Sequence, residues 1–541
     1  MANENLKKID ESTEPTEAEE QFALGNKYYD GEGLPQDTEK AAYWYTKAAE
    51  QGYAAAQNSL GFCYCKGDGV PQDYEKAVYW FDKAAEQGNA KAQNNLGICY
   101  KNGEGVPQDY EKAVYLLIKS AEQGYAMAQK NIGNCYKDGK GVPQDKEKAA
   151  DWYTKAAEQG NAVTQFNLGY YYYNGEGIPQ DYEKAVYWYT KSAEQGDDTA
   201  QYNLGNIYYN GQGAPKDYAK AVYWYSKSAE QGNAEAQCIL GFCYENGLGV
   251  PQDYEKTAYW YAKSAEQGDA EAQHNIGVCY DNGIGVSQDY EKVAYWFTKS
   301  AEQGNALAQY IIGNFYNNGK GVPQDYEKAV YWYAKSAEQG SVNAQCNLGY
   351  NYFNGFGAPQ DYEKAVYWYT KSAEQGNANA QYSLGNIYYN GQGAPQDYEK
   401  AAYWYNKSAE QGNANAQFGL GVCYENGQGM PQDKEKAVHW YVKAAEQGSD
   451  SAQFILGLFY YNEQEAPQDY EKAVYWLTKA AEQENIGAQF VLGLCYTQGR
   501  GVPQDNEKAA YWLAKSMEKG DDQAREYLNQ LEAIRSEENN V

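Results

Sequence analysis

Positive charge is scarce in this sequence, and long apolar runs are absent. The 541 residues include 45 lysines and arginines against 74 aspartates and glutamates, which gives a formal net charge of −29. Nucleic acids and anionic membranes attract proteins through basic surfaces, so this balance argues against both as partners. No run of about 18 apolar residues occurs, and we therefore predict no membrane span.

Histidine and cysteine are also too few for several kinds of site. Only His274 and His439 are present, in different repeats, so we expect neither a histidine-based catalytic group nor a multi-histidine metal site. Ten cysteines are too few for a disulfide-rich scaffold, which favours a reducing compartment. The N-terminal segment lacks the apolar part of a secretory signal. The default expectation is a cytoplasmic protein, with export by a signal-free route left open.

The sequence does contain a 36-residue unit that recurs fourteen times in one phase. Prolines recur every 36 residues from Pro35 to Pro503, and Ser287 is the only substitution in that register. A glutamine recurs at the same interval from Gln21 to Gln489 in all fourteen units. Repeats of this length indicate stacked units and not a series of separate globular domains.

Each unit contains two helical patterns separated by a loop. Apolar residues fall on one helix face at Ala92, Leu96, Cys99 and Tyr100 in the first pattern, and at Ala77, Trp80, Phe81 and Ala84 in the second. Asn89 and Asp73 are the expected N-caps. The loop, G-x-G-V-P, has glycines that permit positive φ and a proline that cannot continue a helix. No stretch alternates with period two, so we predict no sheet.

A helix pair of this size cannot bury its apolar face alone, so neighbouring pairs must bury it jointly. We therefore predict an all-α protein, a solenoid of antiparallel helix pairs, acting as a monomer. The expected organisation is a disordered acidic tail over residues 1–17, fourteen units over residues 18–520, and a capping helix with a short tail over residues 521–541.

The thirteenth unit departs from the others. Glu463 and Glu465 replace both loop glycines, and Glu484 replaces the glycine that ends the unit. If those glycines have positive φ, each glutamate costs about 1–2 kcal/mol. We predict a local weak point or a changed angle between units there.

The unit consensus A-x-A-Q-x-x-L-G-x-x-Y-x-x-G-x-G-V-P-x-D-x-x-K-A-x-x-W-Y-x-K-A-A-x-x-G resembles the Sel1-like repeat family, relatives of the tetratricopeptide repeat. The match covers about residues 18–520. The resemblance implies a right-handed α/α superhelix and an adaptor role in assembling protein complexes. Bacterial members include host-interaction proteins, one of them similar to a binder of secretory immunoglobulin A, so a host-interaction role is one expectation.

A variable stripe on the first helix is the candidate binding surface. The positions of Asn58, Phe62 and Cys65 lie opposite the core, and in related solenoids the first helix lines the concave face. Because exposed aromatic surface marks interaction sites, we predict that a protein or peptide binds there. The alternative is that these side chains pack on neighbouring helices. The predicted contact residues are Phe166, Tyr170, Tyr173, Tyr202, Tyr209, Tyr350, Phe353, Tyr382, Tyr389, Phe418, Phe454, Tyr461 and Phe490.

The second helix carries its own row of tyrosines opposite the core. Twelve of the fourteen units have tyrosine at the position of Tyr79, and Asp151 and His439 are the exceptions. This uniformity favours a structural role, such as packing on the lysine at the position of Lys83. A binding face on the convex side stays an alternative.

We predict no catalytic residue, cofactor, metal or small-molecule substrate. Ser516 and Lys519 have the S-x-x-K spacing of penicillin-binding enzymes, but they lie at a helix end without the companion motifs. The β-lactamase label of some Sel1-like proteins keeps a hydrolase as one alternative, and a regulatory adaptor acting through its acidic surface is another. Seven cysteines share one core position as small buried hydrophobes: Cys63, Cys99, Cys135, Cys243, Cys279, Cys423 and Cys495.

Overall fold

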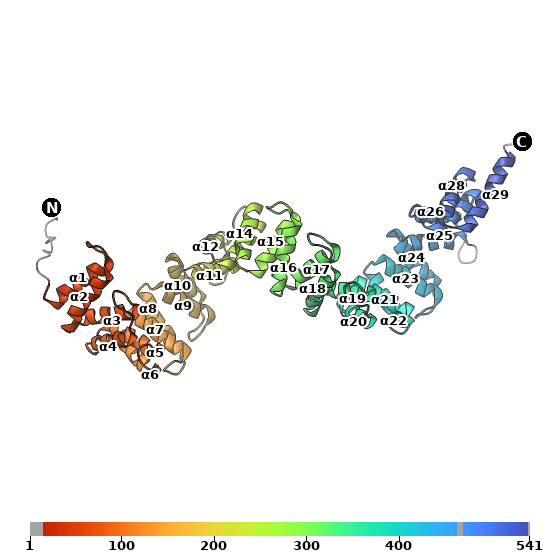
Figure 1. Ribbon diagram of the computed structural model, residues 1–541. Coiled ribbons are helices and arrows are strands. Elements are labelled where there is room, and N and C mark those ends of the chain that lie inside the picture. Colours follow the sequence, from red (N-terminus) through yellow and green to blue (C-terminus); the bar gives the residue numbers. More distant parts are fainter. Residues whose placement is uncertain (1–14, 463–468, 539–541) are drawn as a thin grey trace. The chain divides into compact units, whose positions relative to one another are not determined.

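The structure is a computed structural model that describes residues 15–462 and 469–538, with side chains described up to residue 531 (Figure 1). Helices joined by short loops make up these ranges, and no strand occurs in them. Consecutive helices pack in pairs, which confirms the predicted all-α solenoid. The chain divides into two compact units, Met1–Asp269 and Ala270–Val541.

From α1 to α28, odd-numbered helices are the first helices of the repeats and even-numbered helices are the second, and α29 follows the last repeat. The first compact unit contains α1 (Ala18–Asp30), α2 (Thr38–Glu50), α3 (Ala54–Lys66), α4 (Tyr74–Glu86), α5 (Ala90–Asn102), α6 (Tyr110–Glu122), α7 (Ala126–Asp138), α8 (Lys146–Glu158), α9 (Ala162–Asn174), α10 (Tyr182–Glu194), α11 (Asp198–Asn210), α12 (Tyr218–Glu230), α13 (Ala234–Asn246) and α14 (Tyr254–Glu266). The second contains α15 (Ala270–Asn282), α16 (Tyr290–Glu302), α17 (Ala306–Asn318), α18 (Tyr326–Glu338), α19 (Val342–Asn354), α20 (Tyr362–Glu374), α21 (Ala378–Asn390), α22 (Tyr398–Glu410), α23 (Ala414–Asn426), α24 (Lys434–Glu446), α25 (Asp450–Tyr461), α26 (Tyr470–Glu482), α27 (Ile486–Gln498), α28 (Asn506–Glu518) and α29 (Asp522–Glu538).

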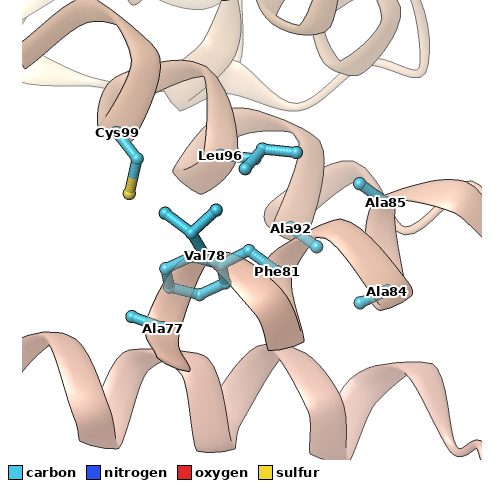
Figure 2. Close-up of a cluster of buried hydrophobic side chains, with 8 residues drawn as sticks. All are labelled: Ala77, Val78, Phe81, Ala84, Ala85, Ala92, Leu96 and Cys99. Atoms are coloured by element: carbon cyan, nitrogen blue, oxygen red, sulfur yellow. The ribbon is translucent and has the colours of Figure 1, made fainter. Parts of the chain in front are cut away.

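The core of each repeat lies between its own helices and those of its neighbours. In the cluster of Figure 2, Ala77 and Phe81 come from the second helix of one repeat, α4. Ala92, Leu96 and Cys99 come from the first helix of the next repeat, α5. The seven cysteines predicted at the Cys99 position are all buried. The apolar faces are therefore shared between repeats, as solenoid stacking requires.

A buried glutamine on each first helix adds polar bonds to this interface. Gln57 Nε2 donates to the carbonyl oxygen of Ala49 in the preceding repeat at 3.1 Å, and Gln57 Oε1 accepts from Gln87 Nε2 at 2.8 Å. The same pair of bonds recurs along the chain, for example at Gln201. Each of these glutamines thus donates to a carbonyl oxygen at the C-terminal end of the preceding repeat's second helix. It also accepts from the glutamine side chain that follows the second helix of its own repeat.

The predicted caps are present. The carboxylate of Asp73 accepts from the backbone N–H of Lys76 at 3.0 Å, and the side chain of Asn89 accepts from Ala92 N–H at 3.0 Å. Asp325, Asp361 and Asp397 cap their helices in the same way. In each case the hydrogen bond from the backbone N–H lowers the pKa of the aspartate.

We expect these caps to make the protein lose stability in acid. A carboxyl whose pKa is lowered by folding stabilises fully above its unfolded value, 3.8, and this contribution is lost as the pH falls through the folded-state pKa. Asparagine caps a helix without titrating. Replacing Asp325, Asp361 and Asp397 together by asparagine should therefore flatten the fall in Tm between about pH 5 and about pH 2. Identical acid profiles for the variant and the wild type would contradict this assignment.

One of the three glycine replacements in the thirteenth unit lies among the described residues. Among the described residues, Glu484 is the only non-glycine residue with positive φ, at 69°. Its carbonyl oxygen and Oε2 both accept from Lys519 Nζ, at 3.1 and 2.9 Å. Glu463 and Glu465, the other two replacements, lie outside the described residues. The predicted weak point therefore has one observed source of strain.

Glu484→Gly is expected to stabilise the second compact unit by about 1 kcal/mol, because glycine adopts positive φ without a steric penalty. The lost ion pair with Lys519 is exposed and contributes little. The matched control is Gly448→Glu at the equivalent place in the preceding repeat, where φ is 94°, and it should destabilise. Urea unfolding together with hydrogen exchange of α26 and α27 measures both, and an unchanged Glu484→Gly midpoint would show that the strain is negligible.

Candidate partner-binding surface

The thirteen predicted contact residues all lie on first helices, from α9 in the first compact unit to α27 in the second. Tyr170 and Tyr350 are the two most open, with 43% and 52% of their surface exposed. The other eleven are half-buried. The stripe is thus a surface with two projecting tyrosines and a row of rings that show only part of their area.

The half-buried rings pack against tyrosines of the second helix in their own repeat. Phe166 and Tyr173 flank the buried ring of Tyr189, with centroid distances of 5.8 and 6.4 Å. In the next repeat Tyr202 and Tyr209 flank Tyr225 at 6.2 and 6.5 Å. The alternative reading, packing on neighbouring helices, therefore accounts for the inner face of these rings, and the outer part stays accessible.

The second compact unit repeats this arrangement. Tyr382 and Tyr389 each lie 6.2 Å from the buried ring of Tyr405. Further along, Phe418 packs on Tyr441 of its own repeat at 5.6 Å, whereas Phe490 packs on Tyr527 of α29, which follows the last repeat, at 5.7 Å. Phe353 lies 5.3 Å from Tyr362, Tyr461 lies 5.6 Å from Tyr470, and Phe454 packs against the core cluster that contains Leu477.

The buried tyrosines also orient polar groups of the stripe. Tyr225 OH donates to Asn206 Oδ1 at 2.8 Å, and Tyr405 OH donates to Asn386 Oδ1 at 2.7 Å. Burial raises the pKa of Tyr225 and of Tyr405, so both hydroxyls stay protonated donors. Each bond is accepted by the amide oxygen, which leaves the amide nitrogen of the same side chain as a donor.

A hollow of about 400 Å³ lies on the stripe between α19 and α21. It is lined by Tyr350, Phe353, Asn354, Tyr369, Ser383, Asn386, Ile387, Asn390 and Gln392. None of these side chains is charged, although the whole chain carries a net charge of −29. Tyr350 and Phe353 were predicted from the sequence. The amide and hydroxyl side chains were missed because a single asparagine, glutamine or serine on a helix gives no sequence signal of a binding site.

A small aromatic cluster adjoins this hollow. Phe356, in the loop after α19, stacks on Tyr326 at 5.5 Å and lies 6.0 Å from Tyr350. All three rings are exposed. Phe356 stands between two loop glycines, where the other repeats carry no aromatic residue, and that exception was the available sequence signal. The hollow and the cluster form one uncharged aromatic surface.

The tyrosine row of the second helices is more exposed than the stripe. Its twelve tyrosines show 46–57% of their surface. Tyr79 packs edge-on against Trp80 at 5.0 Å, and the ammonium group of Lys83 lies 5.9 Å from the Tyr79 ring. The predicted contact with lysine is confirmed at this position and recurs along the row. The same arrangement therefore recurs in most repeats that carry the row, and Tyr115 has Leu116 in place of the tryptophan.

The residues that suggested chemistry have structural roles. Ser516 is fully buried, and its hydroxyl donates to Asp521 Oδ2 at 2.7 Å while Lys519 binds Glu484. Burial raises the pKa of Cys63 to about 12, which keeps that thiol protonated. Within residues 15–462 and 469–538 no group of three or more potential ligands could hold a metal ion. None of the helices described there combines the length and apolarity needed to cross a bilayer.

Comparison with known proteins agrees with this architecture. The family model described as Sel1 repeat matches fourteen consecutive segments: 21–53, 54–89, 90–125, 126–161, 162–197, 198–233, 234–269, 270–305, 306–341, 342–377, 378–413, 414–449, 450–485 and 486–521. No curated protein matches the sequence.

Two solved structures are similar. One is a protective antigen present in uropathogenic Escherichia coli strains, with an SLR fold, which is 39% identical with a TM-score of 0.66 over 80% of this chain and 93% of that chain. The other is a Sel1 repeat protein from Oxalobacter formigenes, 35% identical with a TM-score of 0.48 over 60% of this chain and 93% of that chain. The chain belongs to the Sel1 repeat family.

Proposed function

We propose that this protein is a non-catalytic scaffold that holds a protein or peptide partner against the stripe of its first helices. The observation that carries the proposal is the exposed Tyr350 beside an uncharged, aromatic and amide-lined hollow in a strongly acidic chain. Aromatic rings and amide donors suit an extended peptide, which offers apolar side chains and backbone carbonyls. Solenoids of this kind commonly serve as protein-interaction scaffolds.

A host protein is one partner class within this proposal. Support comes from the similarity to a protein described as a protective antigen of uropathogenic Escherichia coli. A regulatory adaptor that binds through its acidic surface is the second candidate, favoured by the net charge of −29. Salt separates the two, because contacts with aromatic rings depend weakly on ionic strength and contacts with surface carboxylates depend strongly on it.

The test is site-specific photo-crosslinking with p-benzoylphenylalanine placed at Tyr350 or, as the matched control, at Tyr367. Tyr367 lies on the second helix of the same repeat and is 51% exposed, against 52% for Tyr350. We expect a specific crosslinked partner from position 350 and none from position 367. Crosslinks from position 367 alone would move the binding surface to the second helices and contradict the proposal.

A further inference from the structure

The variation along the stripe is itself periodic. At the middle stripe position, tyrosine occurs in only two repeats, the fifth and the tenth, as Tyr170 and Tyr350. The same position reads, in order from the first repeat to the fourteenth, Asn26, Phe62, Ile98, Asn134, Tyr170, Asn206, Phe242, Val278, Asn314, Tyr350, Asn386, Val422, Leu458 and Leu494. When these residues are sorted into asparagine, tyrosine and other apolar residues, the same class returns every five repeats, a distance of 180 residues, and the last repeat is the exception.

At a second position, the basic residues have the same spacing. Between the two loop glycines, a basic residue occurs in only three repeats, as Lys140, Lys320 and Arg500, each five repeats after the last. The third stripe position is glutamate in only two repeats, at Glu245 and Glu425, again 180 residues apart. Two groups of stripe residues therefore correspond. Block A comprises the stripe and loop positions from Tyr170 to Glu245, and block B comprises those from Tyr350 to Glu425.

The two blocks have the same local structure. The side chain of Asn174 donates to the carbonyl oxygen of Tyr170 at 3.0 Å in block A, as Asn354 does to that of Tyr350 at 2.8 Å in block B. At the far end, Tyr261 OH donates to Glu245 Oε2 at 2.7 Å. Tyr441 OH makes the equivalent bond to Glu425 at 2.6 Å. Together with the matching bonds to Asn206 and Asn386, this gives the asparagines and glutamates of the two blocks equivalent bonds. The loops beside the projecting tyrosines differ, because Lys146 pairs with Glu176 at 2.9 Å in block A and Tyr326 stacks on Phe356 at 5.5 Å in block B.

A recent duplication of five repeats would also give two similar blocks, without a function. Differences between the two segments occur both away from the stripe and on it. Exposed positions away from the stripe differ between the two segments: Val163 and Asn343, Ala219 and Glu399, Tyr254 and Lys434, Tyr259 and His439. Six stripe and loop positions are identical: Tyr170 and Tyr350, Tyr202 and Tyr382, Asn206 and Asn386, Tyr209 and Tyr389, Gln212 and Gln392, Glu245 and Glu425. Four other stripe and loop positions differ, so what the two blocks share is the tyrosine, asparagine and glutamate positions; the differing pairs are Tyr173 and Phe353, Glu176 and Phe356, Cys238 and Phe418, and Phe242 and Val422.

We propose that blocks A and B are two copies of one site, so that one chain binds two identical peptide segments. Each block lies entirely within one compact unit. The inference rests on the proposed function and adds the number of sites and the chemistry of the ligand. Three adjacent first helices span about 20 Å at the usual helix spacing, which an extended peptide covers with about six residues.

The residues of the blocks also define what that peptide should carry. The projecting Tyr170 or Tyr350 calls for an apolar or aromatic residue near one end. Asn206 or Asn386 offers an amide donor to a backbone carbonyl in the middle. Glu245 or Glu425 supplies a carboxylate at the other end, which calls for lysine or arginine. The ligand is therefore an extended segment with an apolar start, an uncharged middle and a basic end.

The test uses the full chain and two variants: Tyr170→Ser with Glu245→Gln disables block A, and Tyr350→Ser with Glu425→Gln disables block B. Peptides of twelve residues are selected from a random phage-displayed library on the chain with block A disabled. A selected peptide is then titrated by calorimetry into wild type, both variants and their combination. The control is Tyr187→Ser with Tyr367→Ser, exposed second-helix tyrosines that are also 180 residues apart.

We expect two sites in the wild type and in the control, one in each variant, none in the combination, and affinities of the two sites within about tenfold of each other. Selected peptides should carry a basic residue near one end. One site in the wild type, or a peptide that fails to bind through block A, would overturn the equivalence and leave the proposed function standing. If no peptide is retained by any form of the chain, both the inference and the proposed peptide-binding function fail.

Discussion

Replacing Gln201 by leucine is expected to lower the free energy of local opening at its repeat interface by about 1–3 kcal/mol. Only 5% of Gln201 is exposed, and its amide makes two bonds, to Ala193 O at 3.0 Å and from Gln231 Nε2 at 2.8 Å. Leucine fills the volume but removes both side-chain bonds, so that Ala193 O keeps only the bond from Gly196 N–H at 3.0 Å and the amide of the exposed Gln231 loses its partner. Native-state hydrogen exchange of α10 and α11 measures the loss.

The control for this variant removes only the outer partner. Gln231 is exposed, so Gln231→Ala should cost about 1 kcal/mol. The last repeat already lacks this outer glutamine, because Lys519 stands in its place. There Gln489 Oε1, alone among the described glutamines, is buried without a hydrogen-bond partner. Equal effects of Gln201→Leu and Gln231→Ala would show that the buried bond to the preceding repeat contributes nothing.

Gly313→Ala is expected to destabilise the α17–α18 pair by about 1–3 kcal/mol, although alanine is normally the better helix former. A Cβ atom at Gly313 would lie 2.7 Å from two ring carbons of Tyr333. That ring is buried and its hydroxyl is held by Asn314 Oδ1 at 2.7 Å, so it cannot move aside without losing the bond. The free energy of unfolding in urea and the hydrogen exchange of α17 measure the effect.

Gly277→Ala is the matched control for the helix glycine. Its Cβ would lie 3.1 Å from the nearest ring atom of Phe297, a side chain that has no hydroxyl to anchor it. A shift of a few tenths of an ångström relieves this contact, so the change should be close to neutral. If Gly313→Ala were also neutral, the glycine would be explained by something other than the approach of the Tyr333 ring.

Most of the fold could be predicted from the sequence because its signals are local and repeated. Asp73 and Asn89 cap their helices as expected, since a cap depends on a few neighbouring residues. The buried side of each helix followed from spacing alone, as Leu96 and Cys99 illustrate. The fourteenfold recurrence of each pattern removed the ambiguity that a single short helix would have had.

The proposed binding surface could be predicted only in outline. A helical projection places Tyr170 and Tyr173 on the same outer side, yet Tyr170 projects into solvent and Tyr173 packs on Tyr189. That difference depends on which second-helix ring lies beneath each position, which a projection of one helix does not include. The hollow beside Tyr350 was missed for the same reason, since Ser383 and Asn386 come from the next repeat.

The shared interface between repeats also constrains how such a gene can change in length. Because each repeat begins and ends with the same capping and glutamine contacts, joining the end of any repeat to the start of another recreates a standard interface. Loss of residues 161–340, which are five repeats, would join Gly160 to Ser341. Block B would then follow Lys140 at the same distance in sequence as block A does in the full chain. Recombination in steps of five would thus add or delete whole copies of the proposed site, whereas other steps would preserve the stack and change the order of its surface residues.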